Sequence, residues 1–214
     1  MRKTIFTEGE FYHVYNRGVD KRTIFLDDYD YARFLQSMDE FNTVNPIGSI
    51  YENFFAKKLG HRVSKNKKLV NIVTYCVNPN HFHFILSQVS DRGIEKFMQR
   101  LNMGYAKYFN NKYKRDGVLF QGKFKAVHID TNEYLLHISV YINLNNRVHK
   151  LKNSQFRSSW AEYIDNMTQG FCKKSIILNQ FKNLKEYKEF AEDTFVNILE
   201  RKSLLKELEG LLLE

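Results

Sequence analysis

The sequence contains few residues that cross-link a chain or interrupt its regular structure. It has two cysteines, two prolines and ten glycines in 214 residues. Cys76 and Cys172 lie far apart and form no C-x-x-C pair, which excludes a disulfide framework and a thiolate zinc site. We therefore expect a reducing, cytoplasmic setting. So few prolines and glycines also exclude a fibrous or linker-rich chain.

Long apolar segments are missing as well. No run approaches the roughly 18 apolar residues of a membrane span. The first residues, MRKTIFTEGEFYHVYN, lack the apolar core of a signal peptide. We therefore expect no membrane partner. The closing stretch SLLKELEGLLLE is apolar but short and acidic, and we expect a helix there that docks on another part of the fold.

What the sequence does contain is apolar material and positive charge. Hydrophobic residues make up 43% of the chain and aromatic residues 15%, which is enough for a sizeable core. The net charge is +9 and the isoelectric point is near 9.4. This balance favours an anionic partner, most often nucleic acid. A basic protein without such a partner is the alternative that composition leaves open.

Hydrophobic periodicity predicts strands with helices between them. Alternating or continuous apolar runs predict strands, and apolar residues at helical spacing predict helices. The expected strands are 10–16, 69–77, 81–88 and part of 117–129, and the expected helices are 27–44, 91–113, 130–146 and 183–209. The short turn NPN would join two of these strands into an antiparallel hairpin. This order favours an α+β fold, an antiparallel sheet with helices packed on one face.

Two further features concern the organisation of the chain. The basic run AKKLGHRVSKNKK (56–68) is predicted as an exposed loop, either solvated or in contact with DNA. We expect a boundary near residue 150, which would divide a first domain, 1–150, from a mostly helical C-terminal extension, 151–214.

The strand that follows the NPN turn carries two histidines. Because side chains alternate along a strand, His81 and His83 should share one face, while Phe82 and Phe84 point into the core. Two imidazoles at this spacing can chelate a divalent metal. Half-buried histidines bonded to backbone carbonyls are the alternative, because an isolated H-x-H is a weak motif.

A second constellation lies in the predicted helix HISVYINLNNRVHK (137–150). His137, Tyr141 and Asn145 are spaced four residues apart, so they should stand one above another on the helix. An amide oxygen could complete a metal shell, and the phenol could attack a phosphate that the metal polarises. From spacing alone, a helix with a tyrosine in the core and an asparagine at its rim is the favoured explanation.

The segment YAKYFNNKYKRDGVLFQGKFKAVH (105–128) combines basic and aromatic residues. Lys123 and Lys125 are candidates for binding the phosphates of single-stranded nucleic acid. Tyr105, Tyr108 and Phe109 fall at helical spacing instead, and we expect them in the core.

Taken together, these segments resemble the Y1 transposases of the IS200 type, and more closely the REP-associated tyrosine transposases, a branch of the HUH endonucleases. The stretches that carry the resemblance are FYHVYNRGVDKRTIFLDDYDYARFL (11–35), NPNHFHFIL (78–86), GVLFQGKFKA (117–126), YINLNNRV (141–148) and RSSWAEY (157–163). They form a specific ordered set over roughly residues 8–165. One departure is Asn146, where the family often has proline.

The resemblance implies a fold and a catalytic set. The fold would be a ferredoxin-like or RRM-like antiparallel sheet with flanking helices, followed here by the helical extension. His81, His83 and Asn145 would bind Mg²⁺ or Mn²⁺. Tyr141 would be the nucleophile, with Tyr105 and Tyr108 as lower-ranked rivals on the helix that follows the histidine strand.

The resemblance also implies a substrate. Hairpin-containing single-stranded DNA would be cleaved and rejoined through a 5′-phosphotyrosine intermediate, with release of a 3′-hydroxyl. Arg17, Lys123 and Lys125 would bind this DNA. The protein would be a monomer or homodimer, cytoplasmic and nucleoid-associated in a prokaryotic cell. The alternatives are a non-catalytic, domesticated hairpin-binding protein with the same fold, or another HUH nuclease such as a replication initiator or relaxase.

Overall fold

Five antiparallel strands form the central sheet, in the order β4-β1-β3-β2-β5. The computed structural model describes residues 4–59, 67–165 and 170–211. The strands are β1 (Phe11–Arg17), β2 (Val70–Asn78), β3 (His81–Gln88), β4 (Lys125–Ile129) and β5 (Arg157–Ser158). The predicted hairpin is confirmed, because β2 and β3 pair directly across the turn at Pro79 and Asn80.

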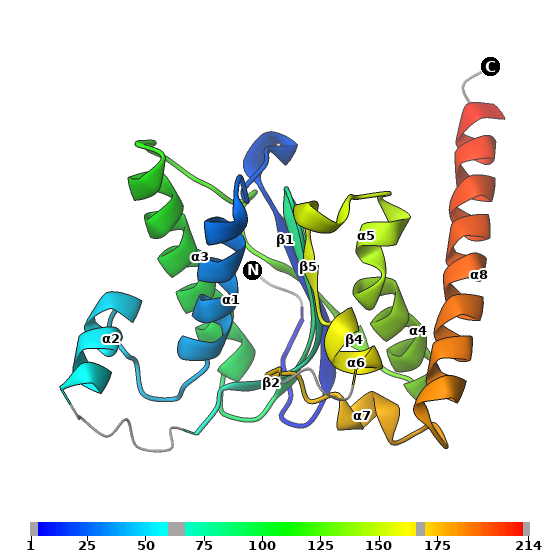
Figure 1. Cartoon of the computed structure of the whole chain (residues 1–214), viewed down its shortest axis with the longest axis horizontal. Helices are drawn as coiled ribbons and strands as arrows, with labels where there is room; N and C mark the ends of the chain where they lie inside the picture. The colour runs from blue at the N-terminus through cyan, green and yellow to red at the C-terminus, as the bar shows by residue number, and fades with distance from the viewer. Residues whose placement is uncertain (1–3, 60–66, 166–169, 212–214) are drawn as a thin grey trace.

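Helices cover both faces of this sheet (Figure 1). They are η1 (Val19–Lys21), α1 (Asp28–Glu40), α2 (Ile50–Lys58), α3 (Gly93–Lys112), α4 (Asn132–Asn143), α5 (Asn145–Val148), η2 (Asn153–Gln155), α6 (Trp160–Ile164), α7 (Ser175–Leu178) and α8 (Leu184–Leu211). The α+β prediction is confirmed, but the expectation that helices pack on one face is wrong. The inner strand β2 is buried along both of its sides, so each side must be covered to remove that surface from water.

Aromatic residues dominate the face covered by α1 and α3. Phe82 and Phe84 of β3 are fully buried there, as predicted, and both rings pack against Phe34 of α1. Phe34 in turn meets Tyr105 of α3 edge to face, with ring centroids 4.9 Å apart. The carbonyl oxygen of Leu69 approaches α3 so closely that a Cβ on Gly93 would lie 2.1 Å from it, which explains the glycine at this contact.

The opposite face is covered by α4 and by helices that follow residue 150. Figure 1 shows α8 alongside α4, and the two helices share a small apolar cluster. Ser159 lies at the start of α6, and its hydroxyl is hydrogen-bonded to Thr74 of β2 and Asn143 of α4 at 2.8 and 2.6 Å. The Tyr163 hydroxyl donates to the carbonyl of Val73 at 2.8 Å. Residues beyond 150 therefore complete both the sheet and the core beneath α4.

Side-chain caps define the starts of α1 and α4. Oδ1 of Asp27 accepts a hydrogen bond from the Asp30 amide, and Oγ1 of Thr131 accepts one from the Tyr134 amide, at 3.0 and 3.1 Å.

Within the described ranges, none of the helices combines the length and the apolar composition that a membrane span requires.

Two predicted elements differ from the structure. The predicted loop over 56–68 begins inside α2, a helix the sequence patterns did not indicate; residues 60–66 of it lie outside the described residues. The single helix predicted over 130–146 is broken at Leu144, whose φ and ψ of −107° and 15° are not helical, and α5 begins after it.

Candidate active site

The two histidines of β3 lie on the face of the sheet covered by α4, next to polar neighbours from other strands. In the antiparallel register, His81 is paired with Arg17 of β1 and with Asn78 of β2. His83 is paired with Tyr15 of β1. Residues directly opposite one another lie on the same face of a sheet. The register therefore gathers these side chains at one end of the sheet.

Amide groups surround the ring of His81. Nδ1 of His81 lies 2.6 Å from Oδ1 of Asn80, so this ring nitrogen carries the proton and donates it to the amide oxygen. Nε2 therefore carries the lone pair and accepts from Nδ2 of Asn78 at 3.0 Å. The same Nδ2 donates to Oδ1 of Asn145 at 2.6 Å, and that oxygen lies 3.3 Å from Nε2 of His81. Nε2 of His81 in β3 and Oδ1 of Asn145 in α5 thus both face the NH₂ group of Asn78.

His83 lies between His13 of β1 and Tyr141 of α4. Nδ1 of His83 is hydrogen-bonded to Nε2 of His13 at 2.9 Å. The ring of His83 meets the ring of Tyr141 edge to face, with centroids 5.9 Å apart. Because Nδ1 of His83 is engaged, Nε2 is the nitrogen that remains for a ligand.

Tyr141 and Asn145 come together in spite of the break at Leu144. Burial raises the pKa of Tyr141, and interaction with the Asn145 amide opposes that rise. Nδ2 of Asn145 is buried and, within the described part of the chain, has no hydrogen-bond partner. His137, predicted on the same helix face, instead meets Phe190 of α8.

A cavity of about 500 Å³ opens in front of the histidines. Its walls are made by Tyr15, Asn16, Arg17, Lys21, Asn80, His81, His83, Gln121, Lys125 and His149, and none of these described residues is acidic. Two of the predicted DNA-binding residues, Arg17 and Lys125, therefore lie beside the histidines. Lys123 is exposed on the preceding loop and does not line the cavity.

Burial keeps the imidazoles of this site neutral. It lowers the pKa of His13 to about 4. Burial, together with the nearby His149, lowers the pKa of His81 to about 4. Burial also lowers the pKa of His83 well below its usual value, and neighbouring His13 acts in the same direction. A neutral imidazole is the form that binds a metal ion.

The donor atoms fit a divalent cation. Two ligand atoms at right angles, each roughly 2.1 Å from one ion, lie about 3 Å apart. Nε2 of His81 and Oδ1 of Asn145 have nearly this separation, and both already accept from the partly positive NH₂ group of Asn78. Asn80 fixes the orientation of the His81 ring as an outer hydrogen-bond partner does in metal sites. Among the described residues, no group of three His, Cys, Asp or Glu side chains is arranged to hold a metal, so the set would depend on the Asn145 amide.

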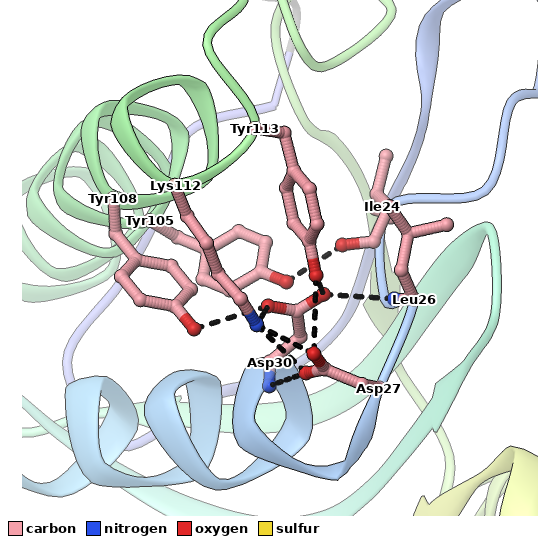
Figure 2. Close-up of polar contacts among 8 residues, drawn as sticks. All are labelled: Ile24, Leu26, Asp27, Asp30, Tyr105, Tyr108, Lys112 and Tyr113. Atoms are coloured by element: carbon pink, nitrogen blue, oxygen red, sulfur yellow. Dashed lines mark hydrogen bonds and ion pairs between the residues drawn. The ribbon is translucent and has the colours of Figure 1, made fainter.

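The rival tyrosines pack in the core cluster on the opposite face of the sheet from Tyr141. Figure 2 shows their polar contacts. The Tyr105 hydroxyl is buried and donates to the carbonyl of Ile24 at 2.6 Å, and burial raises its pKa strongly. The Tyr108 hydroxyl donates to Oδ1 of Asp30 at 3.0 Å. Asp30 also accepts from Lys112 at 2.8 Å. This network ties α1 to α3, and the prediction that Tyr105 belongs to the core is confirmed.

Sequence patterns missed His13, Tyr15 and His149. The alternation in FYHVYNR places His13, Tyr15 and Arg17 on one face of β1, so a local signal for the first two existed. Only the pairing of β1 with β3 puts that face beside the histidines. His149 follows α5, and its ring lies 5.0 Å from that of His81; nothing in its local sequence indicates this contact.

Comparison with known proteins finds one family model that matches this part of the chain. Residues 51–146 match the family model described as transposase IS200 like. Over this segment the chain resembles the IS200-like transposases. The matched segment contains β3, with both histidines, as well as Tyr141 and Asn145. No curated protein matches the chain.

Two solved structures are similar to this chain. One is a REP-associated tyrosine transposase bound to a REP hairpin, at 12% identity and a TM-score of 0.51, covering 79% of this chain and 88% of that one. The other is a protein from Deinococcus radiodurans R1 assigned as a transposase, at 14% identity and a TM-score of 0.38, covering 66% of this chain and 95% of that one. The first likeness establishes a shared fold.

Proposed function

We propose that this protein cleaves and rejoins hairpin-containing single-stranded DNA, with Tyr141 as the nucleophile. The observation that carries the proposal is the meeting of a phenol, two neutral imidazoles and an amide oxygen beside a cavity with a basic wall. The family and the shared fold point to the same activity. The hairpin DNA of the neighbouring structure suggests the class of substrate.

Each side chain has a role that follows from its chemistry. His81, His83 and Asn145 would hold Mg²⁺ or Mn²⁺, which when bound neutralises phosphate charge and stabilises the leaving oxygen. Arg17 and Lys125 would bind phosphates in the cavity. Lys123, exposed on the adjoining loop, would bind the DNA outside it.

The reaction begins at the phenol. The oxygen of Tyr141 attacks phosphorus, a bond from the phenol to the 5′-phosphate forms, and the bond to the 3′-oxygen breaks. The phenol loses its proton and the leaving 3′-oxygen gains one, which yields a 3′-hydroxyl. Because burial raises the pKa of Tyr141, the phenolate needs stabilisation. The unpartnered Nδ2 of Asn145 supplies a donor close by for an oxygen of the reacting groups. Reversal of these steps with a second 3′-hydroxyl rejoins DNA without ATP.

The decisive experiment traps the covalent intermediate. A labelled single-stranded oligonucleotide containing the hairpin that flanks the gene is incubated with protein and Mn²⁺ or Mg²⁺, then run on a denaturing gel. We expect a metal-dependent protein–DNA band that disappears in Tyr141→Phe and remains in Tyr105→Phe. Loss in Tyr105→Phe alone would contradict the assignment of the nucleophile. A native-gel shift without any adduct would favour a hairpin-binding protein that has lost catalysis.

A second experiment separates metal binding from DNA binding. We expect His81→Ala or His83→Ala to abolish the adduct and to leave hairpin binding in EDTA within a few-fold of wild type. Equal loss of binding and cleavage would indicate that the histidines are structural.

A further inference from the structure

A second cavity, of about 400 Å³, opens onto Tyr141 between α4 and α8. Its walls include Tyr134 and Ile138 of α4 and the side chains of Asn197 and Arg201 of α8. Tyr141 lines this cavity and is absent from the described lining of the histidine cavity. The nucleophile therefore stands at the border between two hollows.

We propose that the α4–α8 cavity binds the nucleotide next to the scissile phosphate. This inference rests on the proposed function, because it takes Tyr141 as the nucleophile. A single strand that places phosphorus at the Tyr141 oxygen must continue on both sides of it. The basic histidine cavity accepts one side, and the α4–α8 cavity is the other hollow that Tyr141 itself lines.

The walls have the composition of a nucleotide site. The volume falls within the roughly 300–1,000 Å³ typical of small-ligand sites. The half-buried ring of Tyr134 offers a surface on which a base can stack, as in many single-strand binding proteins. Arg201 is exposed and can pair with a phosphate. Asn197 and Glu133 can hydrogen-bond to the polar edge of a base. The carboxylate of Glu133 would then accept hydrogen bonds from the base rather than face the phosphates of the strand.

The wall contributed by α8 is fixed to α4, which carries Tyr141, and to α5, which follows it. Arg147 forms two hydrogen bonds with the carboxylate of Glu192, at 2.6 and 2.9 Å. The guanidinium of Arg147 also lies over the ring of Phe195, 4.1 Å from its centroid. Ala191 and Phe195 are buried in the cluster that α8 shares with α4. α8 lies beyond the segment that matches the family model, so the site would be a contribution of the C-terminal part of the chain.

The test measures binding of hairpin oligonucleotides whose single-stranded flanks are cut back one nucleotide at a time on each side. Fluorescence anisotropy in EDTA gives affinity without catalysis, and the denaturing gel gives the adduct. Arg201→Gln removes the cation, and Asn197→Trp fills the cavity at an exposed position. Lys188→Gln removes an equal charge from an exposed position of α8 outside the cavity.

We expect Arg201→Gln to weaken binding of the full-length flank about 5- to 20-fold and to reduce the salt slope by about one. Substrates cut back on the side that enters the cavity should bind wild type and Arg201→Gln equally. Asn197→Trp should show the same pattern, and Lys188→Gln should behave as wild type.

Three results would overturn the proposal: wild-type affinity in both cavity variants, an equal loss for every flank length, or no dependence of wild-type binding on flank length. A Tyr141-dependent adduct without an Arg201 effect rejects the cavity and keeps the proposed function. A flank-dependent Arg201 effect without any adduct supports the cavity and rejects the covalent chemistry.

Discussion

The hydrogen bond between His13 and His83 predicts a positioning role for a residue of β1. His13 is only 8% exposed, and its Nε2 is the partner of Nδ1 of His83 at 2.9 Å. When this bond is lost, little water can replace it, and the His83 ring can turn or adopt the other tautomer. Outer hydrogen-bond partners of metal-binding histidines typically contribute about 10- to 100-fold in metal affinity.

The choice of substitution decides how clear the test is. His13→Ala would leave a cavity and a buried nitrogen of His83 without a partner, which costs roughly 1–3 kcal/mol for the unpaired group alone. His13→Leu fills the space but also leaves Nδ1 of His83 without a partner, so its effect comes from the lost hydrogen bond rather than from a cavity. His13→Gln keeps a carbonyl oxygen that can accept from Nδ1 of His83, so it should restore much of the effect.

The measurement is Mn²⁺ binding, by titration calorimetry or by the electron paramagnetic resonance signal of free Mn²⁺. We expect affinity to fall about 10- to 100-fold in His13→Leu and to recover to within a few-fold of wild type in His13→Gln. Thermal unfolding in EDTA checks that both variants are folded. If His13→Leu binds Mn²⁺ as tightly as wild type, the hydrogen bond does not orient a metal ligand.

The remaining predictions concern stability. In metal-free protein, the free energy of unfolding should fall as pH drops from 6.5 towards 4, because an imidazole in the unfolded chain binds a proton near pH 6.5 whereas the pKa of folded His13 is about 4. This difference corresponds to about 3 kcal/mol for His13. Urea titrations at several pH values measure the fall, and His13→Gln should show a smaller dependence on pH. Asp30→Asn should cost about 3 kcal/mol, since Lys112 loses a buried partner, and a Tm unchanged from wild type would refute this. Gly93→Ala should cost about 1–3 kcal/mol, because its Cβ would collide with the Leu69 carbonyl, as chemical denaturation can show.

Local sequence patterns predict the parts of this fold that depend on neighbours in the chain. The apolar run before the NPN turn and the alternation after it place the β2–β3 hairpin within a residue of its observed ends. The same alternation places His81 and His83 on one face and Phe82 in the core. Both results need only the period of two in a strand.

The parts that local patterns miss depend on contacts between distant segments. The β1–β3 register brings His13 to His83 across 70 positions, and no local pattern fixes that register. Local patterns also predict helices on one face of the sheet instead of two, for a related reason. Buried strands such as β2 are apolar on both sides, and this composition does not tell one covering layer from two.

Tyr141 and Asn145 can meet His83 and His81 because the spacing of side chains along a helix nearly matches the spacing along a strand. Four residues of helix advance about 6 Å, and two residues of strand advance about 6.8 Å. A continuous helix laid along β3 could therefore set Tyr141 against His83 and, one turn later, Asn145 against His81. The observed contacts keep this spacing although the helix is broken at Leu144, between the two residues. Because α4 ends before Asn145, that side chain is positioned by α5 and by its bonds to β2, while Tyr141 stays at the border of the two cavities. The break at Leu144 thus lets one segment hold a buried amide against the sheet and keep a phenol beside open space.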